Sequence, residues 1–208
     1  MTRVFIVRHG ETEWNTLGWL QGTSDIPLND NGKNQARRMA AALATLVAPD
    51  AVLVSSPLSR ARDTGVALGA QLGAAVELDE RLVERAYGPW EGVTPADRAA
   101  RWPEQVEAWH SGGNPHLEGF EVHDLVRDRM VEAVTEWASR TPSDLVVFTH
   151  GSAARIGIMG LLGLSLEHRS LSGLGNTCWS RLRSREDGRW TLERHNVSVD
   201  DLYPGAAA

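Results

Sequence analysis

Residues 4–12 read VFIVRHGET, an apolar run that leads directly into an arginine, a histidine and a glycine. Two further runs, AVLV at residues 51–54 and LVVF at residues 145–148, are also continuous and also end in polar residues. Continuous apolar runs are typical of strands covered on both faces, because strands with one solvent-exposed face alternate between apolar and polar residues. We therefore predict three buried strands of one sheet.

Segments with a helical period lie between these runs. In the last of them apolar residues recur at spacings of three and four, the pattern of a helix with one buried face, and the second is rich in alanine. The three segments are residues 35–47, 59–72 and 122–137. Strands that alternate with helices predict an α/β fold, a three-layer sandwich with a mostly parallel central sheet and helices on both faces. Residues 178–183 and 190–194, separated by the charged turn 185–189, predict a hairpin at one sheet edge.

Residues 94–120 differ in amino-acid composition from the rest of the chain. They contain Pro95, Pro103 and Pro115 and the flexible run SGG at residues 111–113. We predict a small helical cap inserted beside the sheet, with Pro103 at a helix start, where its missing N–H donor costs nothing. One domain over residues 1–208 is expected to carry this insertion, and residues 204–208 are expected to fray.

The composition restricts the classes of function. The 21 basic and 27 acidic residues give a net charge of −6, which argues against a surface that coats nucleic acid or an anionic membrane. The one cysteine, Cys178, cannot form an internal disulfide, which fits a reducing compartment. No apolar run resembles a signal peptide. We therefore expect a cytoplasmic protein with a small-molecule partner, no nucleic-acid or membrane partner, and a homodimer as one candidate assembly.

Polar residues follow each of the three predicted strands. Arg8 and His9 follow the first strand, Arg60 lies in the loop after the second, and His150 follows the third. Because ligands of open α/β sheets bind beyond the carboxyl ends of the strands, we expect these side chains to meet at one rim. Guanidinium groups bind phosphoryl oxygens in bidentate fashion, and an uncharged imidazole can attack phosphorus. The pattern predicts a site for a phosphoryl dianion.

The same rim offers a second interpretation, a zinc site. Its candidate ligands are His9, Glu11, His150 and His195. No HExxH or CxxC spacing supports a metal, and a single His-Gly pair is more often structural than catalytic. Two His-Gly pairs together with an arginine-bearing loop favour the phosphate site. Gly10 and Gly151, which follow the two histidines, are expected to open helices whose amides favour anions.

Five segments carry a resemblance to a known family. They are RHGETEWN at residues 8–15, QGTSDIPLNDNGKNQA at 21–36, SPLSRARDT at 56–64, LVERAYGPWEG at 82–92, and His150 with Gly151. In sequence and in order they resemble the RHGxTxxN signature and the later motifs of the histidine phosphatase superfamily, also called the phosphoglycerate mutase-like family. The resemblance runs from about residue 3 to at least residue 163.

The resemblance implies a role for each matching residue. It makes His9 the nucleophile that becomes phosphorylated, and Glu84 the general acid that protonates the leaving alkoxide and then deprotonates the attacking water. The residues implied in binding the phosphate are Arg8, Asn15, Gln21, Gly22, Arg60 and His150. No metal or other cofactor is implied, because fixed cations supply the charge that phosphoryl transfer needs.

The family includes phosphatases and mutases. The mutases typically have a Gly-Trp pair where this chain has Gly22 and Thr23, and a longer insertion than the 66 positions between Glu84 and His150. Both features favour hydrolysis: a metal-independent phosphomonoesterase that acts through phosphohistidine on a small phosphorylated metabolite. A cofactor-dependent phosphoglycerate mutase is the alternative, and a catalytically idle phosphate-binding or regulatory protein on the same fold is another.

Two loops bear on the substrate. Where many relatives have GGES, this chain has EGFE at residues 118–121, and Phe120 predicts a less polar leaving group. Residues 173–179 resemble actinobacterial members of the family that dephosphorylate glucosyl phosphoglycerate. Four tryptophans have two possible roles: they line the cap, or they form its local core. They are Trp19, Trp90, Trp102 and Trp109.

Overall fold

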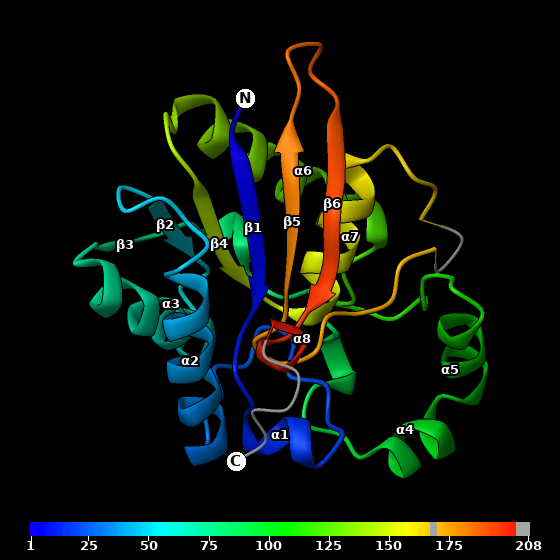
Figure 1. The fold of residues 1–208 in the computed structure, drawn as a ribbon. Coiled ribbons are helices and arrows are strands. Elements are labelled where there is room, and N and C mark those ends of the chain that lie inside the picture. Colours follow the sequence, from blue (N-terminus) through cyan, green and yellow to red (C-terminus); the bar gives the residue numbers. More distant parts are fainter. Residues whose placement is uncertain (167–169, 203–208) are drawn as a thin grey trace.

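In this computed structural model, which describes residues 1–166 and 170–202, six strands form one sheet in the order β3-β2-β4-β1-β5-β6 (Figure 1). The strands are β1 (Arg3–Arg8), β2 (Val52–Ser55), β3 (Val76–Leu78), β4 (Leu145–Thr149), β5 (Trp179–Ser184) and β6 (Trp190–Val197). Strands β1 to β4 pair in parallel, whereas β5 is antiparallel to β1 and β6 to β5. The prediction of a mostly parallel sheet is confirmed.

The three predicted apolar runs form the middle of the sheet. They correspond to β1, β2 and β4, whose apolar side chains are almost entirely buried. The predicted hairpin is β5 and β6, with β6 at the edge of the sheet. Strand β3 was not predicted, because its three residues, Val76, Glu77 and Leu78, lie at the other edge and are half-exposed or exposed.

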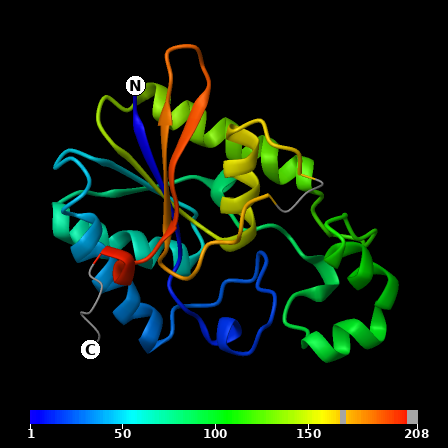
Figure 2. The same ribbon diagram turned by 45° about the vertical axis from the view of Figure 1, so that its right-hand side comes forward.

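Helices cover both faces of the sheet (Figure 2). The described α-helices are α1 (Glu13–Thr16), α2 (Asp30–Leu43), α3 (Ser59–Leu72), α4 (Pro95–Arg101), α5 (Pro103–His110), α6 (His123–Arg140), α7 (Gly151–Leu161) and α8 (Val199–Leu202), of which α2, α3, α6 and α7 pack on the sheet. Phe5 and Val7 of β1 pack against α2 and α3, and Val4 and Ile6 pack against α6 and α7. The alternation of side chains along β1 therefore divides the core into two layers, as the three-layer prediction requires.

Helix boundaries follow local capping. Helix α3 has the predicted bounds because Gly73 ends it in the left-handed conformation, at φ 66°. Helix α2 begins five residues before the predicted segment because the side chain of Asn29 accepts a hydrogen bond from the amide of Gly32. None of the described helices is both long and apolar enough to cross a membrane. Residues 204–208, predicted to fray, lie outside the described part.

The cap consists of α4 and α5, which stand away from the sheet in both views (Figures 1 and 2). Pro95 and Pro103 occupy the first helical positions, as predicted for Pro103. A small separate core, built on the buried side chains of Tyr87, Trp90 and Phe120, joins the cap to the loops beneath it. The cap thus borders the carboxyl ends of the parallel strands.

Candidate active site

The register of the central strands brings the two predicted histidines together. Arg8 pairs with Thr149 at the ends of β1 and β4, and the amide of His9 donates to the carbonyl of Thr149 at 3.0 Å. His150 follows on β4, and the centroids of the two imidazole rings lie 5.2 Å apart. Two residues distant in sequence are therefore neighbours because both follow adjacent parallel strands.

A cavity of about 190 Å³ opens at this rim. The predicted site residues that line it are Arg8, His9, Asn15, Gln21, Arg60, Glu84 and Gly151. His150 and Gly22 are not among its lining residues: His150 is fully buried, with its ring centroid 5.2 Å from that of His9, and Gly22 contributes a backbone carbonyl. The structure thus gathers the predicted residues from five separate segments of the chain.

His9 has the properties of a nucleophile. Its Nδ1 lies 2.7 Å from the carbonyl oxygen of Gly10. Because a carbonyl can only accept, Nδ1 carries the hydrogen and Nε2 keeps a free lone pair. Burial, with the positive charges of Arg8 and Arg60, holds the pKa of His9 well below its ordinary value. The ring is therefore neutral at physiological pH, the form that attacks phosphorus.

His150 lies beside His9 and is also neutral. Its Nε2 lies 2.9 Å from the hydroxyl of Ser56. Burial and the charge of Arg60 hold the pKa of His150 well below its ordinary value. Its Nδ1 is buried and has no hydrogen-bond partner within residues 1–166 and 170–202. Ser56, which belongs to the SPLSRARDT segment but had no predicted role, orients this ring.

Arg60 reaches the cavity from the first turn of α3. Its Nη1 donates to the carbonyl of Ser24 at 2.7 Å and its Nη2 to that of Gly22 at 2.8 Å. Burial lowers the pKa of Arg60 to about 10, which leaves it charged. Gly22 has a left-handed backbone, with φ +52°, and a Cβ at this position would overlap the carboxylate of Glu91. Gly22 therefore holds the guanidinium of Arg60 in place instead of lining the cavity.

Arg8 approaches from the end of β1. Its Nη1 donates to the carbonyl of Leu174 at 2.7 Å, in the segment that precedes β5. Burial lowers the pKa of this guanidinium. Its hydrogen bond goes to a carbonyl, as do those of Arg60, so neither charge is neutralised by these bonds.

Three nitrogens at this rim share an unusual feature. Arg8 Nε, Arg60 Nε and His150 Nδ1 are buried, and none has a hydrogen-bond partner in the part of the chain that the structure describes. A buried polar nitrogen without a partner costs about 1–3 kcal/mol, so a group of them in one place indicates a site that binds a ligand. Donors on two cationic side chains suit an anion with several acceptor oxygens, such as a phosphoryl group.

Glu84 is fixed by the amino-terminal end of α7. Its Oε1 accepts hydrogen bonds from the amides of Arg85 and Ala153, both at 2.9 Å, and its Oε2 accepts from the amide of Ser152 at 3.1 Å. The helix dipole favours a carboxylate at this position. Gly151 does open a helix, as predicted, but two amides of its first turn bind Glu84.

The prediction that Gly10 opens a helix is wrong. Helix α1 begins at Glu13, and Thr12 is its N-cap. Gly10 is instead needed for close packing, because a Cβ there would lie 2.6 Å from the carbonyl oxygen of Gly32. Its amide donates to the hydroxyl of Thr64 at 3.0 Å, which ties the nucleophile's loop to α3.

Asn15 and Gln21 complete the polar wall of the cavity. Asn15 Oδ1 accepts from the amide of Thr12 at 3.1 Å and from Asn176 Nδ2 at 3.3 Å, which identifies Asn15 Nδ2 as the donor end of the amide. Asn176 also donates to the carbonyl of His9 at 3.0 Å. The Oε1 of Gln21 is buried and unpaired within the described residues. Both predicted amides are thus placed where they can contact a ligand.

Some residues of the site were not predicted. Tyr87 and Ser152 line the cavity with the predicted residues, and burial raises the pKa of the Tyr87 hydroxyl. Tyr87 stands at an unspecified position of the LVERAYGPWEG segment, so only its distance of three residues from Glu84 could have drawn attention to it. Asn176 lies in the segment 173–179, which was noted only for its resemblance to some members of the family, and no role was predicted for it.

The aromatic residues divide between wall and core. Trp19 lines the catalytic cavity and Trp109 lines its neighbour, whereas Trp90 is buried in the cap core. Phe120 lines neither cavity: it packs on Tyr87 and Trp90, with ring centroids 5.7 and 5.3 Å away. The prediction that Phe120 makes the leaving-group pocket less polar is therefore wrong.

The four residues of the zinc interpretation do not meet. Glu11 accepts hydrogen bonds from the side chains of Asn29 and Asn31, and His195 on β6 contacts Ser172 and Ser180. Within residues 1–166 and 170–202, no three His, Cys, Asp or Glu side chains form a group that could hold a metal ion.

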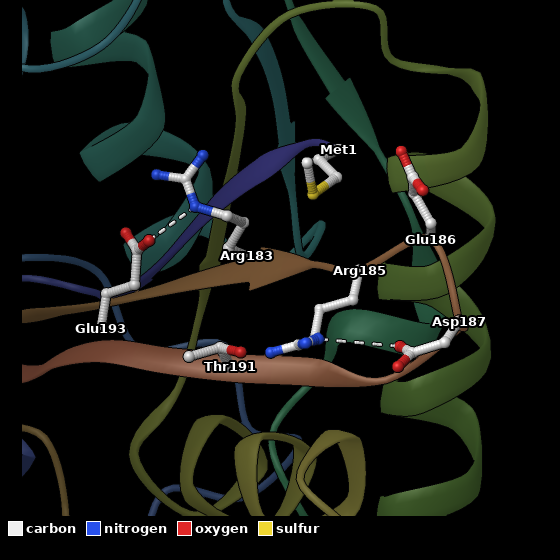
Figure 3. Close-up of a pocket in the computed structure, with 7 residues that line it drawn as sticks. All are labelled: Met1, Arg183, Arg185, Glu186, Asp187, Thr191 and Glu193. Carbon is white, nitrogen blue, oxygen red and sulfur yellow. Dashed lines mark hydrogen bonds and ion pairs between the residues drawn. The ribbon is translucent and has the colours of Figure 1, made fainter.

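A different hollow, of about 530 Å³, lies at the opposite end of the sheet, beside the turn between β5 and β6 (Figure 3). Its arginines are paired: Arg183 Nε lies 2.6 Å from Glu193 Oε1, and Arg185 Nε lies 3.8 Å from Asp187 Oδ1. Because its charges compensate one another, this hollow lacks the unmatched positive charge found at the rim.

Comparisons with known proteins agree with this geometry. Residues 4–198 match the family model described as "Histidine phosphatase superfamily (branch 1)". A glucosyl-3-phosphoglycerate phosphatase of Mycolicibacterium vanbaalenii is 34% identical over 95% of each chain. A metal-independent phosphoserine phosphatase of Arabidopsis thaliana is 31% identical over 99% of this chain and 87% of the relative. The structure of a mycobacterial glucosyl-3-phosphoglycerate phosphatase with VO3 is similar, with 32% identity, a TM-score of 0.86, and coverage of 95% of this chain and 100% of that one.

Proposed function

Because the chain belongs to the histidine phosphatase superfamily (branch 1), we propose that His9 is the nucleophile with which it hydrolyses phosphoric monoesters. The protein is a phosphatase of small phosphorylated metabolites, as its relatives are. The observation that carries the assignment is a set of three buried side-chain nitrogens near the neutral ring of His9 that have no partner among the described residues. These nitrogens belong to Arg8, Arg60 and His150.

In the first step, His9 Nε2 attacks the phosphorus of the bound ester. The P–N bond forms while the bond from phosphorus to the ester oxygen breaks, and Glu84 in its protonated form gives its proton to the leaving alkoxide. Phosphoryl transfer passes through a loose transition state with charge on the equatorial oxygens. The fixed donors of Arg8, Arg60 and His150 stabilise that charge without a metal ion.

In the second step, water attacks the phosphohistidine. Glu84, now a carboxylate, takes a proton from the water, the new P–O bond forms, and the electron pair of the P–N bond returns to Nε2. The amides of Ser152 and Ala153 keep the same carboxyl group in place for both steps. Inorganic phosphate then leaves, and His9 is again neutral.

The shape of the site supports hydrolysis over a mutase reaction. A mutase must return the phosphoryl group to a retained ligand and keep water away from phosphohistidine. Here the cavity continues into a second, larger one of about 410 Å³ that borders the cap. Water can therefore reach the intermediate. The idle-protein alternative is disfavoured because Arg8, His9, Arg60, Glu84 and His150 are all present and gathered at one rim.

One experiment tests the proposal directly. The purified enzyme is given p-nitrophenyl phosphate in excess EDTA, and a rapid quench at alkaline pH, which preserves the acid-labile phosphohistidine, is followed by mass spectrometry of the peptide that contains His9. We expect chelator-resistant turnover and a phosphohistidine at residue 9. Turnover that requires a metal ion, or phosphate migration within phosphoglycerate that outpaces hydrolysis, would reject it.

We also propose that the enzyme acts in the cytoplasm. Its one cysteine, Cys178, is half-buried, and burial raises the pKa of its thiol, which keeps it in the unreactive protonated form. A thiol without a partner in the same chain is typical of a reducing compartment. Fractionation of the source cells should recover the activity with cytoplasmic markers, and recovery with exported proteins would contradict this placement.

A further inference from the structure

The hydroxyl of Ser56 is held beside the ring of His150 by the sheet. Ser55, the last residue of β2, pairs with Phe148 of β4, and the amide of Ser56 donates to the carbonyl of Phe148 at 2.9 Å. The Oγ of Ser56 lies 2.9 Å from His150 Nε2. Both residues directly follow neighbouring parallel strands and both are fully buried, so the register of the sheet sets this contact.

The turn after β2 determines how the hydroxyl of Ser56 can be used. The amide of Leu58 donates to Ser56 Oγ at 3.3 Å, so this oxygen already accepts one hydrogen bond. Pro57, which lies between the two residues, has no N–H and cannot compete for the hydroxyl. Such turns, in which a serine side chain binds the backbone two residues further on, are common. A hydroxyl that accepts from an amide still has its own hydrogen to donate.

One acceptor is available for that hydrogen. Within residues 1–166 and 170–202, Ser56 Oγ makes hydrogen-bonding contacts with the amide of Leu58 and with His150 Nε2, and of these two only the ring nitrogen can accept. If Nε2 carried a hydrogen, the buried hydroxyl would have no acceptor, which is costly. The contacts therefore favour a hydrogen bond in which Ser56 donates and His150 Nε2 accepts.

A neutral imidazole carries its hydrogen on one of its two nitrogens. Burial and the charge of Arg60 lower the pKa of His150 and keep the ring neutral. When Nε2 accepts from Ser56, Nδ1 must therefore carry the hydrogen. Nδ1 is the ring nitrogen that has no partner in the part of the chain that the structure describes. In this tautomer Nδ1 can donate to a phosphoryl oxygen, whereas in the other tautomer it would turn a lone pair towards that oxygen.

We propose that Ser56 is a positioning residue that acts through His150: it holds the ring in the tautomer with the hydrogen on Nδ1, so that the ring can donate to the phosphoryl group. The first serine of the segment SPLSRARDT, at residues 56–64, thereby gains a part in phosphate binding without contacting the phosphate. This inference rests on the proposed function, because the phosphoryl group that Nδ1 binds is the one that His9 attacks.

NMR of the ring nitrogens measures the tautomer directly. Protonated and unprotonated imidazole nitrogens have well-separated ¹⁵N resonances, and the His150→Asn variant, which lacks this ring, identifies the signals of His150 in enzyme labelled with ¹⁵N-histidine. At neutral pH we expect the form with the hydrogen on Nδ1 in about tenfold excess or more. In Ser56→Ala this form should fall to about half of the molecules or fewer. A majority with the hydrogen on Nε2 in the unmodified enzyme would overturn the proposal.

Orthovanadate connects the tautomer to the bound anion. Because it binds the form with the hydrogen on Nδ1, it should draw His150 of the Ser56→Ala variant back to that form. The inhibition constant of a ligand that binds one form rises by the factor by which the share of that form falls. We therefore expect a rise of about two- to tenfold in Ser56→Ala, equal to the loss of the Nδ1 form measured by NMR. A rise without any change in the tautomer would overturn the proposal.

Ser55→Ala is the matched control. The hydroxyl of Ser55 is also buried at the end of β2, but it donates to the carbonyl of Ser56 at 2.8 Å instead of contacting the ring. Its loss should leave both the tautomer of His150 and the inhibition constant of orthovanadate unchanged, whatever its effect on stability. If Ser55→Ala shifts the tautomer as much as Ser56→Ala does, the effect belongs to packing around β2 and the proposal is wrong.

The His150→Asn variant also provides a background in which the tautomer cannot change. The amide nitrogen of the new side chain can donate near the position of Nδ1, and no atom takes the position of Nε2 beside Ser56. Adding Ser56→Ala in this background should leave the inhibition constant of orthovanadate unaltered. A further rise as large as the one in the unmodified background would show that Ser56 acts by a route other than His150.

The same measurements separate this inference from the proposed function. Inhibition by orthovanadate and hydrolysis of p-nitrophenyl phosphate by an enzyme whose His150 keeps its hydrogen on Nε2 would overturn the role of Ser56 and leave the proposed function intact. An enzyme that neither binds orthovanadate nor hydrolyses p-nitrophenyl phosphate would overturn the proposed function itself.

Discussion

Arginines lie at both ends of the sheet, but they differ in exposure and in whether they pair with carboxylates. At the hairpin end, Arg183 and Arg185 are 40% and 54% exposed, and each faces a carboxylate (Figure 3). At the rim, the hydrogen bonds of Arg8 and Arg60 go to backbone carbonyls, and an Nε of each is buried and unpaired within the described residues. Neither Arg8 nor Arg60 forms a direct ion pair within residues 1–166 and 170–202, and such a buried cation is costly, so its presence indicates a site at which an anionic ligand binds.

The largest effect should come from the histidine that the rim arginines surround. His9→Ala removes the nucleophile, and turnover of p-nitrophenyl phosphate should fall by at least about 10⁴-fold, because no other group can form the covalent intermediate. The matched control is His195→Ala, on β6 away from the cavity, which should stay within about threefold of the unmodified enzyme. Substantial turnover in His9→Ala would show that the rim is not the reacting site.

Glu84→Gln should come next, and only for poor leaving groups. An amide cannot protonate an alkoxide, so kcat for an alkyl phosphate should fall by about 10²- to 10⁴-fold. Aryl phosphates should lose much less in the first step, and a burst of nitrophenolate should reveal a slowed second step. Steady-state and burst kinetics on both ester types check this. Equal losses without a burst would contradict an acid role for Glu84.

Exchanging Arg60 and Arg183 for lysine tests the comparison itself. Arg60→Lys should lower kcat/KM by about 10²- to 10³-fold, because a single ammonium nitrogen cannot take the positions of the three guanidinium nitrogens that face Ser24, Gly22 and a phosphoryl oxygen. Arg183→Lys should have little effect on kcat/KM, and any loss of stability should stay below about 1 kcal/mol, as for other exposed ion pairs. Similar kinetic losses in the two variants would remove the distinction between the ends of the sheet.

The rim should also make stability depend on pH. Burial lowers the pKa of His9 and of His150, so the folded protein keeps both neutral where the unfolded chain takes up protons, below about pH 6.5. The free energy of unfolding should therefore fall as the pH falls below that value, by up to about 1.4 kcal/mol per pH unit for each histidine. Urea unfolding at pH 7 and pH 5.5 measures the fall.

The matched variant is His9→Gln, in which part of this acid-induced loss should disappear. His110→Gln, on the exposed face of the cap helix α5, serves as the control and should retain the loss in full. If His9→Gln loses as much stability as the unmodified protein between the two pH values, His9 is not buried in its neutral form.

Sequence analysis predicted the parts of the fold that depend on local pattern. The central strands could be recognised because each is covered on both faces and is therefore continuously apolar. Helix α3 could be bounded because Gly73 provides a left-handed C-cap. Strand β3 could not be predicted, because it is a short and exposed edge strand. The start of α2 could not be predicted either, because it depends on one side-chain hydrogen bond of Asn29.

The site was predicted less completely than the fold. Motif residues could be named, but their partners depend on tertiary contacts. The link between Glu84 and the amides of α7 joins segments 68 residues apart, and no sequence spacing reveals it. Phe120 was misplaced for the same reason: an aromatic residue in a loop can face a pocket or a core, and only packing against Trp90 decides between them.

The central claim is that Arg8, Arg60 and His150 hold one phosphoryl group in front of His9. A crystal structure of the enzyme soaked with orthovanadate tests it most directly. We predict vanadium within bonding distance of His9 Nε2, with its oxygens within about 3.2 Å of Arg8 Nε, Arg60 Nε and His150 Nδ1. An oxyanion bound elsewhere, or one in this cavity that leaves those three nitrogens without a partner, would contradict the claim.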